Sequence, residues 1–330
     1  MKISTLSISK SKNPSEDVLI ALDSRVLGLF DGASTNNTIK VFGQSYGRYA
    51  ANIAAKSAIE YRDLLDQGVI FEPNDVIKYI SSSLNKAYSD GKIDVPYPAT
   101  TGAMVFIEEY VSHFLVVGDT GVRVNGDLIL SNEIVADRIW RELRKYVYGW
   151  YLGEFDYPGC LLSDGVLSMY YDCEALSQNI LYNGLECAEG GLRDYIKSQI
   201  MDNNTIEING LSAKQVCDIM LQGISGVQHS FANAKENAVG YAIFNGDRVI
   251  GENKYLSLPN NEIRHIEIFS DGYLFPPTVV DRCPTIQEWE NLYSYIEKTD
   301  PFHLSEWPHL KCRLNKDFFD DRSLLIAEYK

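Results

Sequence analysis

Three apolar segments of this chain each end in an Asp-Gly pair, a place where a carboxylate can do chemistry. They are "VLGLFDGAS", "CLLSDGVLS" and "IEIFSDGYL", whose aspartates are Asp31, Asp164 and Asp271. A carboxylate that emerges from an apolar strand is partly desolvated, which is costly unless it is hydrogen-bonded or binds a cation. Each Asp-Gly pair is also typical of a turn, so the pattern alone leaves both interpretations open.

Further acidic residues lie at the ends of other predicted strands, at Glu16-Asp17, Asp119 and Asp320-Asp321. Oxygen ligands are those that Mg²⁺ and Mn²⁺ prefer, and several strand ends together can supply a shell that waters complete. A glycine after the aspartate lets its backbone carbonyl come close enough to be a further ligand. These residue types therefore predict a divalent-metal site if the strand ends meet, which spacing along the chain does not decide.

The elements that must position these residues form groups of strands and groups of helices rather than a strict alternation. The predicted helices are 45–68, 73–91, 189–202, 211–224 and 285–298, and the predicted strands are 17–24, 25–31, 101–109, 110–130, 238–250, 262–272 and 321–329. Asn125-Gly126 is a strong hairpin signal. This grouping favours an α+β domain in which helices cover antiparallel sheets.

The region from about 132 to 235 differs from the rest because it is rich in aromatic residues and mostly helical. No linker rich in Pro, Ser or Gly separates it from its neighbours, so we expect a variable insertion within one domain. Its aromatic segment 146–157 could recognise a substrate or a partner, although core packing of the insertion is favoured.

The composition limits the classes of function. The chain has 330 residues and a net charge of −15, which argues against nucleic acid or an anionic membrane as its main partner. No segment has the length and apolarity of a signal-peptide core or a membrane span. The six cysteines form no CxxC pair, so we expect neither a zinc site nor a disulfide framework, and a cytoplasmic location is the simplest interpretation.

Six ordered segments resemble the motifs of the metal-dependent Ser/Thr protein phosphatases of type 2C, the PPM family, and of its bacterial members in particular. They are "NPSED" (13–17), "LGLFDGAS" (27–34), "ATTGAMVFI" (99–107), "FLVVGDTGVRVNGD" (114–127), "IEIFSDGYL" (266–274) and "DDRSLLIAEY" (320–329). Each motif is weak alone, whereas their order along nearly the whole chain is specific.

The resemblance implies one phosphatase-like catalytic domain over residues 1–330, built as a four-layer α-β-β-α sandwich of two antiparallel sheets flanked by helices. It also implies a centre of two Mg²⁺ or Mn²⁺ ions, with a third, weaker metal site. The implied metal ligands are Glu16, Asp31, the carbonyl of Gly32, Asp119, Asp271 and Asp320. Asp31 would bridge the two ions.

Two assignments of residues to the family's motifs need a choice between candidates. Aligning "DDRS" with the closing motif of the family places the ligand at Asp320, with Asp321 as the alternative. Asp164 does not fit the family's Ser-Asp-Gly position, which comes shortly before the last strand, so a turn is expected there.

The resemblance implies hydrolysis of phosphoserine and phosphothreonine in phosphorylated proteins. Two ions ~4 Å apart would share a water, lower its pKa and direct it at phosphorus. Asp31 and Asp271 would be catalytic, with Lys12 at the position of the family's phosphate-binding Arg and Lys10 as a nearby substitute. Ala33 stands close to where many eukaryotic members have a histidine that protonates the leaving group.

Two alternatives to this function stay open. The chain could be a catalytically weak or inactive pseudophosphatase that acts as a regulatory binding module, since Lys12 and Ala33 depart from the family pattern. It could also hydrolyse small phosphate esters instead of phosphoproteins. The sequence does not reveal the oligomeric state.

Overall fold

The computed structural model describes most of the chain. The described residues are 1–10, 13–22, 25–33, 40–93, 97–132, 134–152, 164–202, 210–234, 238–273, 276–278, 282–300, 302–303 and 320–329. The chain divides into two compact units. The first consists of Met1–Glu133, Tyr241–Tyr293 and Asp320–Lys330, and the second of Ile134–Gly240 and Ser294–Phe319.

The first unit contains two antiparallel sheets, each with five strands in the described part of the chain. One sheet has the order β1 (Lys2–Ile8), β12 (Arg322–Glu328), β11 (His265–Phe269), β8 (Gly121–Val124) and β9 (Leu128–Ser131). The other has the order β10 (Asn253–Pro259), β7 (Val111–Val117), β6 (Ala99–Ile107), β3 (Val26–Ala33) and β2 (Val18–Leu22). A short hairpin joins β4 (Lys40–Val41) to β5 (Gln44–Ser45).

The two sheets pack face to face, and their strand alternation builds the core between them. Leu27 and Leu29 of β3 share one apolar cluster with Ile268 of β11 and Leu325 of β12. Alternate positions along a strand point to opposite faces. The intervening residues of β3, such as Phe30, therefore face the other way, into the cluster beneath the helices.

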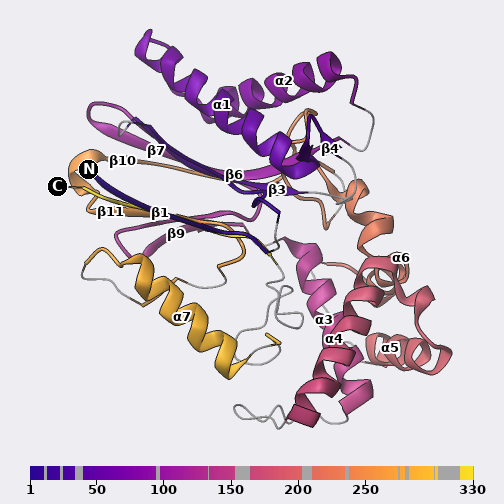
Figure 1. The fold of residues 1–330 in the computed structure, drawn as a ribbon. Helices are drawn as coiled ribbons and strands as arrows, with labels where there is room; N and C mark the ends of the chain where they lie inside the picture. Colours follow the sequence, from indigo (N-terminus) through magenta and orange to yellow (C-terminus); the bar gives the residue numbers. More distant parts are fainter. Residues whose placement is uncertain are drawn as a thin grey trace. The chain divides into compact units, whose positions relative to one another are not determined.

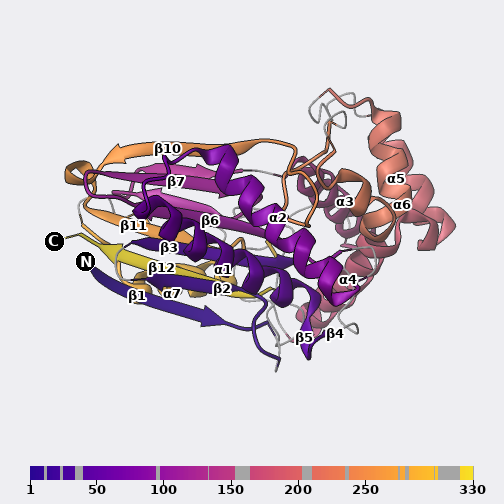
Figure 2. The same cartoon turned by 90° about the horizontal axis from the view of Figure 1, so that it is seen from above.

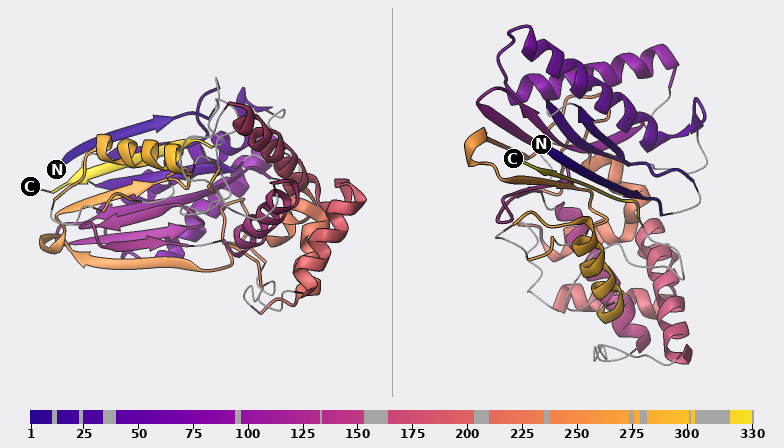
Figure 3. Two further views of the ribbon diagram at one scale, coloured as in Figure 1. Left: turned by 90° about the horizontal axis from the view of Figure 1, so that it is seen from below. Right: turned by 60° about the vertical axis from the view of Figure 1, so that its left-hand side comes forward.

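Helices cover both outer faces of this sandwich (Figure 1). Helices α1 (Tyr46–Asp66) and α2 (Pro73–Gly91) pack on the β3 sheet, and Figure 2 shows them lying across its strands. Helix α7 (Ile286–Thr299) covers the other sheet, as the view from below in Figure 3 shows. Its Trp289 packs into an apolar cluster with Phe269 of β11 and Leu324 of β12. The predicted α-β-β-α sandwich is confirmed.

The second unit is helical in its described part. Its helices are α3 (Val135–Leu152), α4 (Asp164–Asn183), α5 (Gly190–Asp202) and α6 (Ala213–Phe231), and the short 3₁₀ turn Leu185–Cys187 follows α4. A buried ion pair joins Arg144 to Glu174, with 2.8 Å between the nitrogen and the oxygen. Tyr148 of the aromatic segment also donates to Glu174 and is buried, whereas Trp150 and Tyr151 are exposed. Residues 153–157 of that segment lie outside the described residues.

Two local predictions are wrong. Asp164 is the first residue of α4 and does not lie in a turn. The predicted strand at 238–250 is absent from the described residues 238–250, where Phe244 forms an isolated bridge to Thr100 instead of a ladder. Gly246, at φ +89°, turns the chain there, and the strand of this region is β10 at Asn253–Pro259.

Four of the five predicted helices agree with the structure within two residues at each end, whereas the helix predicted at 211–224 continues to Phe231 in α6. Residues 73–91 form α2, and Asn125 and Gly126 both have positive φ, as their hairpin requires. Within the described residues, no helix combines the length and the apolar composition needed to cross a membrane.

Candidate metal centre at the strand ends

Strand register brings Asp31 to the end of the sandwich and turns it inward. Val18 of β2 pairs with Phe30 of β3, so the next position along this ladder sets Asp17 opposite Asp31. Asp31 continues the series of Leu27 and Leu29, which face the other sheet. The Asp31 side chain therefore lies on the inter-sheet face, where the strands of the other sheet also end.

The other sheet contributes Asp271 and the pair Asp320-Asp321 at the same end. Strand β11 ends at Phe269, which pairs with Leu324 of β12. The next residues are joined by a backbone hydrogen bond of 3.0 Å from Ser270 to Ser323. Asp271 consequently lies beside the start of β12, and Asp320-Asp321 is the pair that directly precedes this strand.

Glycine is required after both aspartates because the backbone is crowded there. A Cβ on Gly272 would lie 2.1 Å from the Asp321 carbonyl oxygen, and a Cβ on Gly32 would lie 2.4 Å from the carbonyl carbon of Gly47. Gly47 lies in the first turn of α1. Gly32 therefore lets the helix start approach β3, and its predicted role as a carbonyl ligand stays a prediction.

Asp321 ties the N-terminal acidic segment to this end of the sandwich. Its carboxylate accepts the backbone N–H of Lys10 at 2.7 Å and that of Glu16 at 2.6 Å. On the other side, Arg48 of α1 donates to the carbonyl oxygens of Ser15, at 2.9 Å, and Asp17. Both carboxylate oxygens of Asp321 thus accept hydrogen bonds from backbone N–H groups. Asp320 is therefore the better candidate metal ligand of the two.

We call Glu16, Asp17, Asp271, Asp320 and Asp321 the carboxylate cluster. Lys10 provides a positive charge at its edge, with its Nζ 3.3 Å from Asp320 Oδ1 and 3.6 Å from Glu16 Oε2. The motif spacing favours Lys12, which lies outside the described residues. The register of β1 and β12, which pairs Ile8 with Arg322, carries Lys10 into this position.

Asp17 is a buried carboxylate that lies among other carboxylates. It is 2% exposed, and neither of its carboxylate oxygens has a hydrogen-bond partner of good geometry among the described residues. Burial raises the pKa of this carboxyl to about 7, and the nearby Ser323 side chain offsets part of that rise. The negative charges of Asp320, Asp321 and Asp271 raise it further. A bound cation would relieve this concentration of buried negative charge.

Asp119 lies two strands away from Asp31, at the same end of the strands of their sheet. Thr101 of β6 pairs with Asp31, and the turn after β7 packs on Thr101 at Gly118. Gly118 has φ +83°, and a Cβ there would lie 2.2 Å from Thr101 Cγ2. Asp119 therefore follows the end of β7, and its predicted role at a third metal site stays a prediction.

The donor set fits a hard divalent cation, although its ligand shell is not preassembled. Among the described residues, no group of three or more His, Cys, Asp or Glu side chains is arranged to hold a metal ion. Like charges repel, so carboxylates without a cation between them are expected to lie apart. The candidate ligands share one end of the sandwich, and their coordination distances stay a prediction.

Two residues of this region have contacts that the sequence does not reveal. Thr100 donates its hydroxyl to the Asp31 carbonyl at 2.7 Å and is fully buried. Arg48 looks like an ordinary helix-surface arginine, yet it fixes the backbone of the acidic segment. Neither role follows from residue type or spacing, because both depend on segments that are distant in the chain.

Comparison with known proteins finds similarity among solved structures. No protein-family model matches it, and no curated protein matches it. Solved structures similar to it include a bacterial serine phosphatase, at 11% identity and a TM-score of 0.46, covering 100% of this chain and 98% of that chain.

Two further solved structures are similar to the chain at the same level. The Ser/Thr phosphatase Stp1 from Staphylococcus aureus has 10% identity, a TM-score of 0.45, and coverage of 100% and 95%. The catalytic domain of the Ser/Thr phosphatase PstP, in complex with two manganese ions, has 12% identity, a TM-score of 0.44, and coverage of 99% and 97%. These are bacterial phosphatases of the type that the ordered motifs resemble. At TM-scores below 0.5, the function of this chain has to be argued from its own residues.

Proposed function

We propose that this chain is a metal-dependent phosphatase that hydrolyses phosphoserine and phosphothreonine in cytoplasmic proteins. The observation that carries the proposal is the carboxylate cluster itself. Chain segments around residues 16, 271 and 320 contribute buried or half-buried carboxylates to the end of the sandwich where Asp31 emerges. A protein gains no stability from such a concentration of like charge, which supports a functional reason for it.

Glu16, Asp31, the Gly32 carbonyl, Asp271 and Asp320 would hold two Mg²⁺ or Mn²⁺ ions, and Asp119 a third, weaker one. When bound, such ions lower the pKa of a shared water and neutralise phosphoryl oxygens. The chain's own contribution is to keep these oxygens in place. Asp321 and Arg48 hold the backbone of the acidic segment, and Thr100 fixes that of Asp31.

Substrate binding requires positive charge at this acidic end. Lys10 has its ammonium beside Asp320 and Glu16, where it can pair with a phosphoryl oxygen as a point charge. Lys12, four residues before Glu16, remains the sequence-based candidate for the same role. Ala33 supplies no acid, so protonation of the leaving group would fall to water, at a cost of at most ~10²–10⁴-fold.

All candidate ligands belong to the first compact unit. We therefore also propose that this unit is the catalytic part of the domain, with the helical region at about 132–235 as a variable insertion. In this view the insertion modifies substrate choice rather than the chemistry.

The test is Mn²⁺-dependent hydrolysis of p-nitrophenyl phosphate and of a phosphothreonine peptide. Wild type should turn over both substrates, and Asp31→Asn should be at least about a hundredfold slower, since even outer partners of metal ligands cost 10–100-fold. Asp164→Asn is the matched control, because Asp164 begins α4 in the second unit and should leave the rate unchanged.

The alternatives give different results in the same assay. Turnover of the small ester alone would favour a hydrolase of small phosphate esters. No metal-dependent turnover of either substrate by wild type would contradict the enzyme and favour a pseudophosphatase with a binding role. Loss of activity in Asp164→Asn together with normal activity in Asp271→Asn would show that the ligands are assigned to the wrong Asp-Gly pairs.

A further inference from the structure

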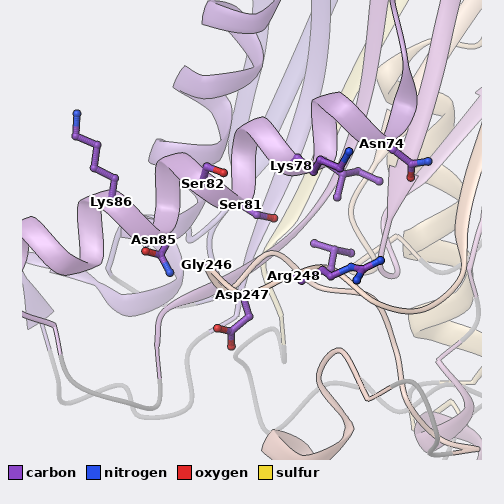
Figure 4. A pocket seen from close by; sticks show the side chains of 11 residues that line it. Asn74, Lys78, Ser81, Ser82, Asn85, Lys86, Gly246, Asp247 and Arg248 are labelled. Carbon is purple, nitrogen blue, oxygen red and sulfur yellow. The ribbon is translucent and has the colours of Figure 1, made fainter.

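A pocket of about 610 Å³ lies between helix α2 and the loop that follows Phe244 (Figure 4). We call it the α2 pocket. It shares no residue with the carboxylate cluster, and its lining combines polar and basic side chains with the apolar Ile77 and Val249 and one acid, Asp247. The residues that matter for its chemistry are Asn74, Lys78, Ser81 and Asn85 of α2, and Asp247 and Arg248 of the loop.

Both walls of the pocket are held firmly in place. Helix α2 buries Val76, Ile80 and Leu84 in the core, so its opposite face is fixed toward the loop. The loop is anchored by Phe244, whose backbone N–H and C=O each bond to Thr100 at 2.9 Å. Gly246 then turns against the ring of Tyr88, where a Cβ would lie 3.0 Å from the ring carbons.

Positive charge gathers at one end of the pocket, in a chain whose net charge is −15. Arg248 is exposed and has no ion-pair partner within the described part of the chain, while Lys78 has only a surface pair with Asp75 at 3.3 Å. Exposed ion pairs of this kind contribute little to the stability of the fold, so Lys78 can exchange Asp75 for a ligand at little cost. Figure 4 shows Arg248 on the same side of the pocket as Lys78 and Asn74, with Asp247 pointing away from the helix.

Ser81 adds a hydroxyl group that the fold leaves unused. It is 7% exposed, and its buried Oγ has no hydrogen-bond partner in the described structure. Two other serines of α2 do bond to the carbonyl four residues before them. Ser83 donates to the Tyr79 carbonyl at 3.0 Å, and Ser89 to that of Asn85 at 2.9 Å. Ser81 instead lines the pocket between Lys78 and Asn85.

We propose that the α2 pocket binds a small organic phosphate, with Arg248 and Lys78 on the phosphate and with Ser81 and Asn85 hydrogen-bonding to the ligand. A guanidinium matches phosphate oxygens with two parallel bonds, and an ammonium adds a point charge. The volume is within the range of sites for small molecules. A buried unpaired hydroxyl costs free energy, and a ligand that bonds to Ser81 would offset this cost.

The direct test is calorimetric titration of the full chain with glucose 6-phosphate, with AMP and with inorganic phosphate. EDTA is present so that metal-dependent phosphate binding at the strand ends does not contribute, and a failure of the proposed phosphatase function leaves this result unaffected. We expect an organic phosphate to bind more tightly than inorganic phosphate, and unphosphorylated glucose and adenosine not to bind. Saturation by neither organic phosphate below about 10 mM, an affinity weaker than that of small-molecule sites in general, would overturn the proposal.

Two substitutions identify the site of binding. Arg248→Glu should weaken binding at least tenfold, as expected for loss of a charge-assisted hydrogen bond. Lys56→Glu makes the same charge change on α1 outside the pocket, at a side chain that is 77% exposed, and should bind as wild type does. Equal affinities for Arg248→Glu and wild type would overturn the assignment to this pocket.

Ser81→Ala separates ligand binding from folding. It should weaken binding several-fold without lowering the melting temperature, because the hydroxyl that it removes has no partner in the described part of the fold. Unchanged binding in Ser81→Ala would contradict the role of this hydroxyl. Tighter binding of a phosphothreonine peptide than of either organic phosphate, lost in Arg248→Glu, would replace the small ligand with a phosphorylated protein segment.

Discussion

The carboxylate cluster and the α2 pocket are polar sites in the same compact unit, yet they are built in opposite ways. Asp17 and Asp321 are each 2% exposed, and backbone N–H groups and Arg48 hold the cluster together. In the pocket the charged side chains are exposed, and Ser81 is buried. The cluster therefore concentrates negative charge in a buried site, whereas the pocket exposes positive charge to solvent.

This difference predicts where each site should affect folding. Like charges in a buried cluster cost free energy unless a cation or a proton is bound, so substitutions there should change stability and its pH dependence. Exposed cations cost almost nothing to keep, so substitutions in the pocket should change ligand affinity alone. Substitutions at the two sites test this contrast, and the largest effects on stability are expected in the cluster.

The largest effect is expected where a side chain would enter the crowded backbone of the cluster. Gly272→Ala sets a Cβ 2.1 Å from the Asp321 carbonyl oxygen, and neither backbone segment can rotate away as a side chain could. We expect the free energy of unfolding to fall by at least about 3 kcal/mol, at the upper end for overpacking. Urea denaturation followed by circular dichroism measures it.

The control for this substitution is a glycine with open space around it. A Cβ on Gly190, at the start of α5, would have no heavy atom of the described residues within 4 Å, apart from its own chain neighbours. Gly190→Ala should therefore change stability by less than about 1 kcal/mol. If Gly272→Ala were as stable as Gly190→Ala, the close approach of Asp271-Gly272 to the start of β12 would be wrong. Asp271 would then no longer belong to the carboxylate cluster.

These glycines also explain why sequence alone could not separate the three Asp-Gly pairs. The pairs at 31, 164 and 271 look alike locally, and their difference lies in what packs on the glycine. Gly32 meets α1 and Gly272 meets β12, whereas Asp164 starts a helix. Strand and helix periodicity predicted the elements and the layers, because those signals are local, but not the contacts between distant segments.

The second prediction concerns the pH dependence of stability in EDTA. Since the pKa of Asp17 is raised to about 7, the folded chain binds this proton more tightly than the unfolded chain. The stabilisation is complete below pH 4 and is lost as the pH rises toward 7. Asp17→Asn removes this dependence, so it should be more stable than wild type by up to about 4 kcal/mol at pH 8, and no more stable at pH 4.

Urea denaturation of both proteins between pH 4 and pH 8 checks this sign. The same measurement on Arg248→Glu, whose site is exposed, should give a curve parallel to that of wild type. A stability difference between Asp17→Asn and wild type that stayed constant with pH would mean that Asp17 is not buried beside the other carboxylates. The contrast between the two sites would then fail.

The third prediction concerns metal affinity rather than catalysis. The ammonium of Lys10 lies 3.3 Å from Asp320 and 3.6 Å from Glu16, so it competes for oxygens that a metal would use. Lys10→Met should therefore bind Mn²⁺ on the order of tenfold more tightly. Titration calorimetry measures this without any turnover, and Lys56→Met is the control with the same loss of charge. Weaker binding by Lys10→Met would instead show that Lys10 organises the ligands.

Lys10 also marks a limit of reasoning from sequence at this site. Spacing from Glu16 points to Lys12, because the motif is counted along the chain. The pairing of β1 with β12 decides which lysine reaches the acidic residues, and that register is set by tertiary packing. The prediction of a strand at 238–250 was wrong for a similar reason, because a contact with a distant segment decides the local structure. Phe244 is fully buried and pairs with Thr100 in a single bridge, without a ladder on either side.

The smallest effect is expected in the α2 pocket, and it is informative because it should be close to zero. Ser81→Ala removes a buried hydroxyl without a partner among the described residues, so the free energy of unfolding should stay within about 0.5 kcal/mol of wild type or rise. Ser112→Ala is the matched comparison, because its fully buried hydroxyl donates to Asn260 Oδ1 at 2.7 Å. It should cost about 1–3 kcal/mol by leaving that partner unsatisfied. Equal losses in the two variants, measured by urea denaturation, would mean that Ser81 is bonded within the fold and has no hydroxyl to offer a ligand.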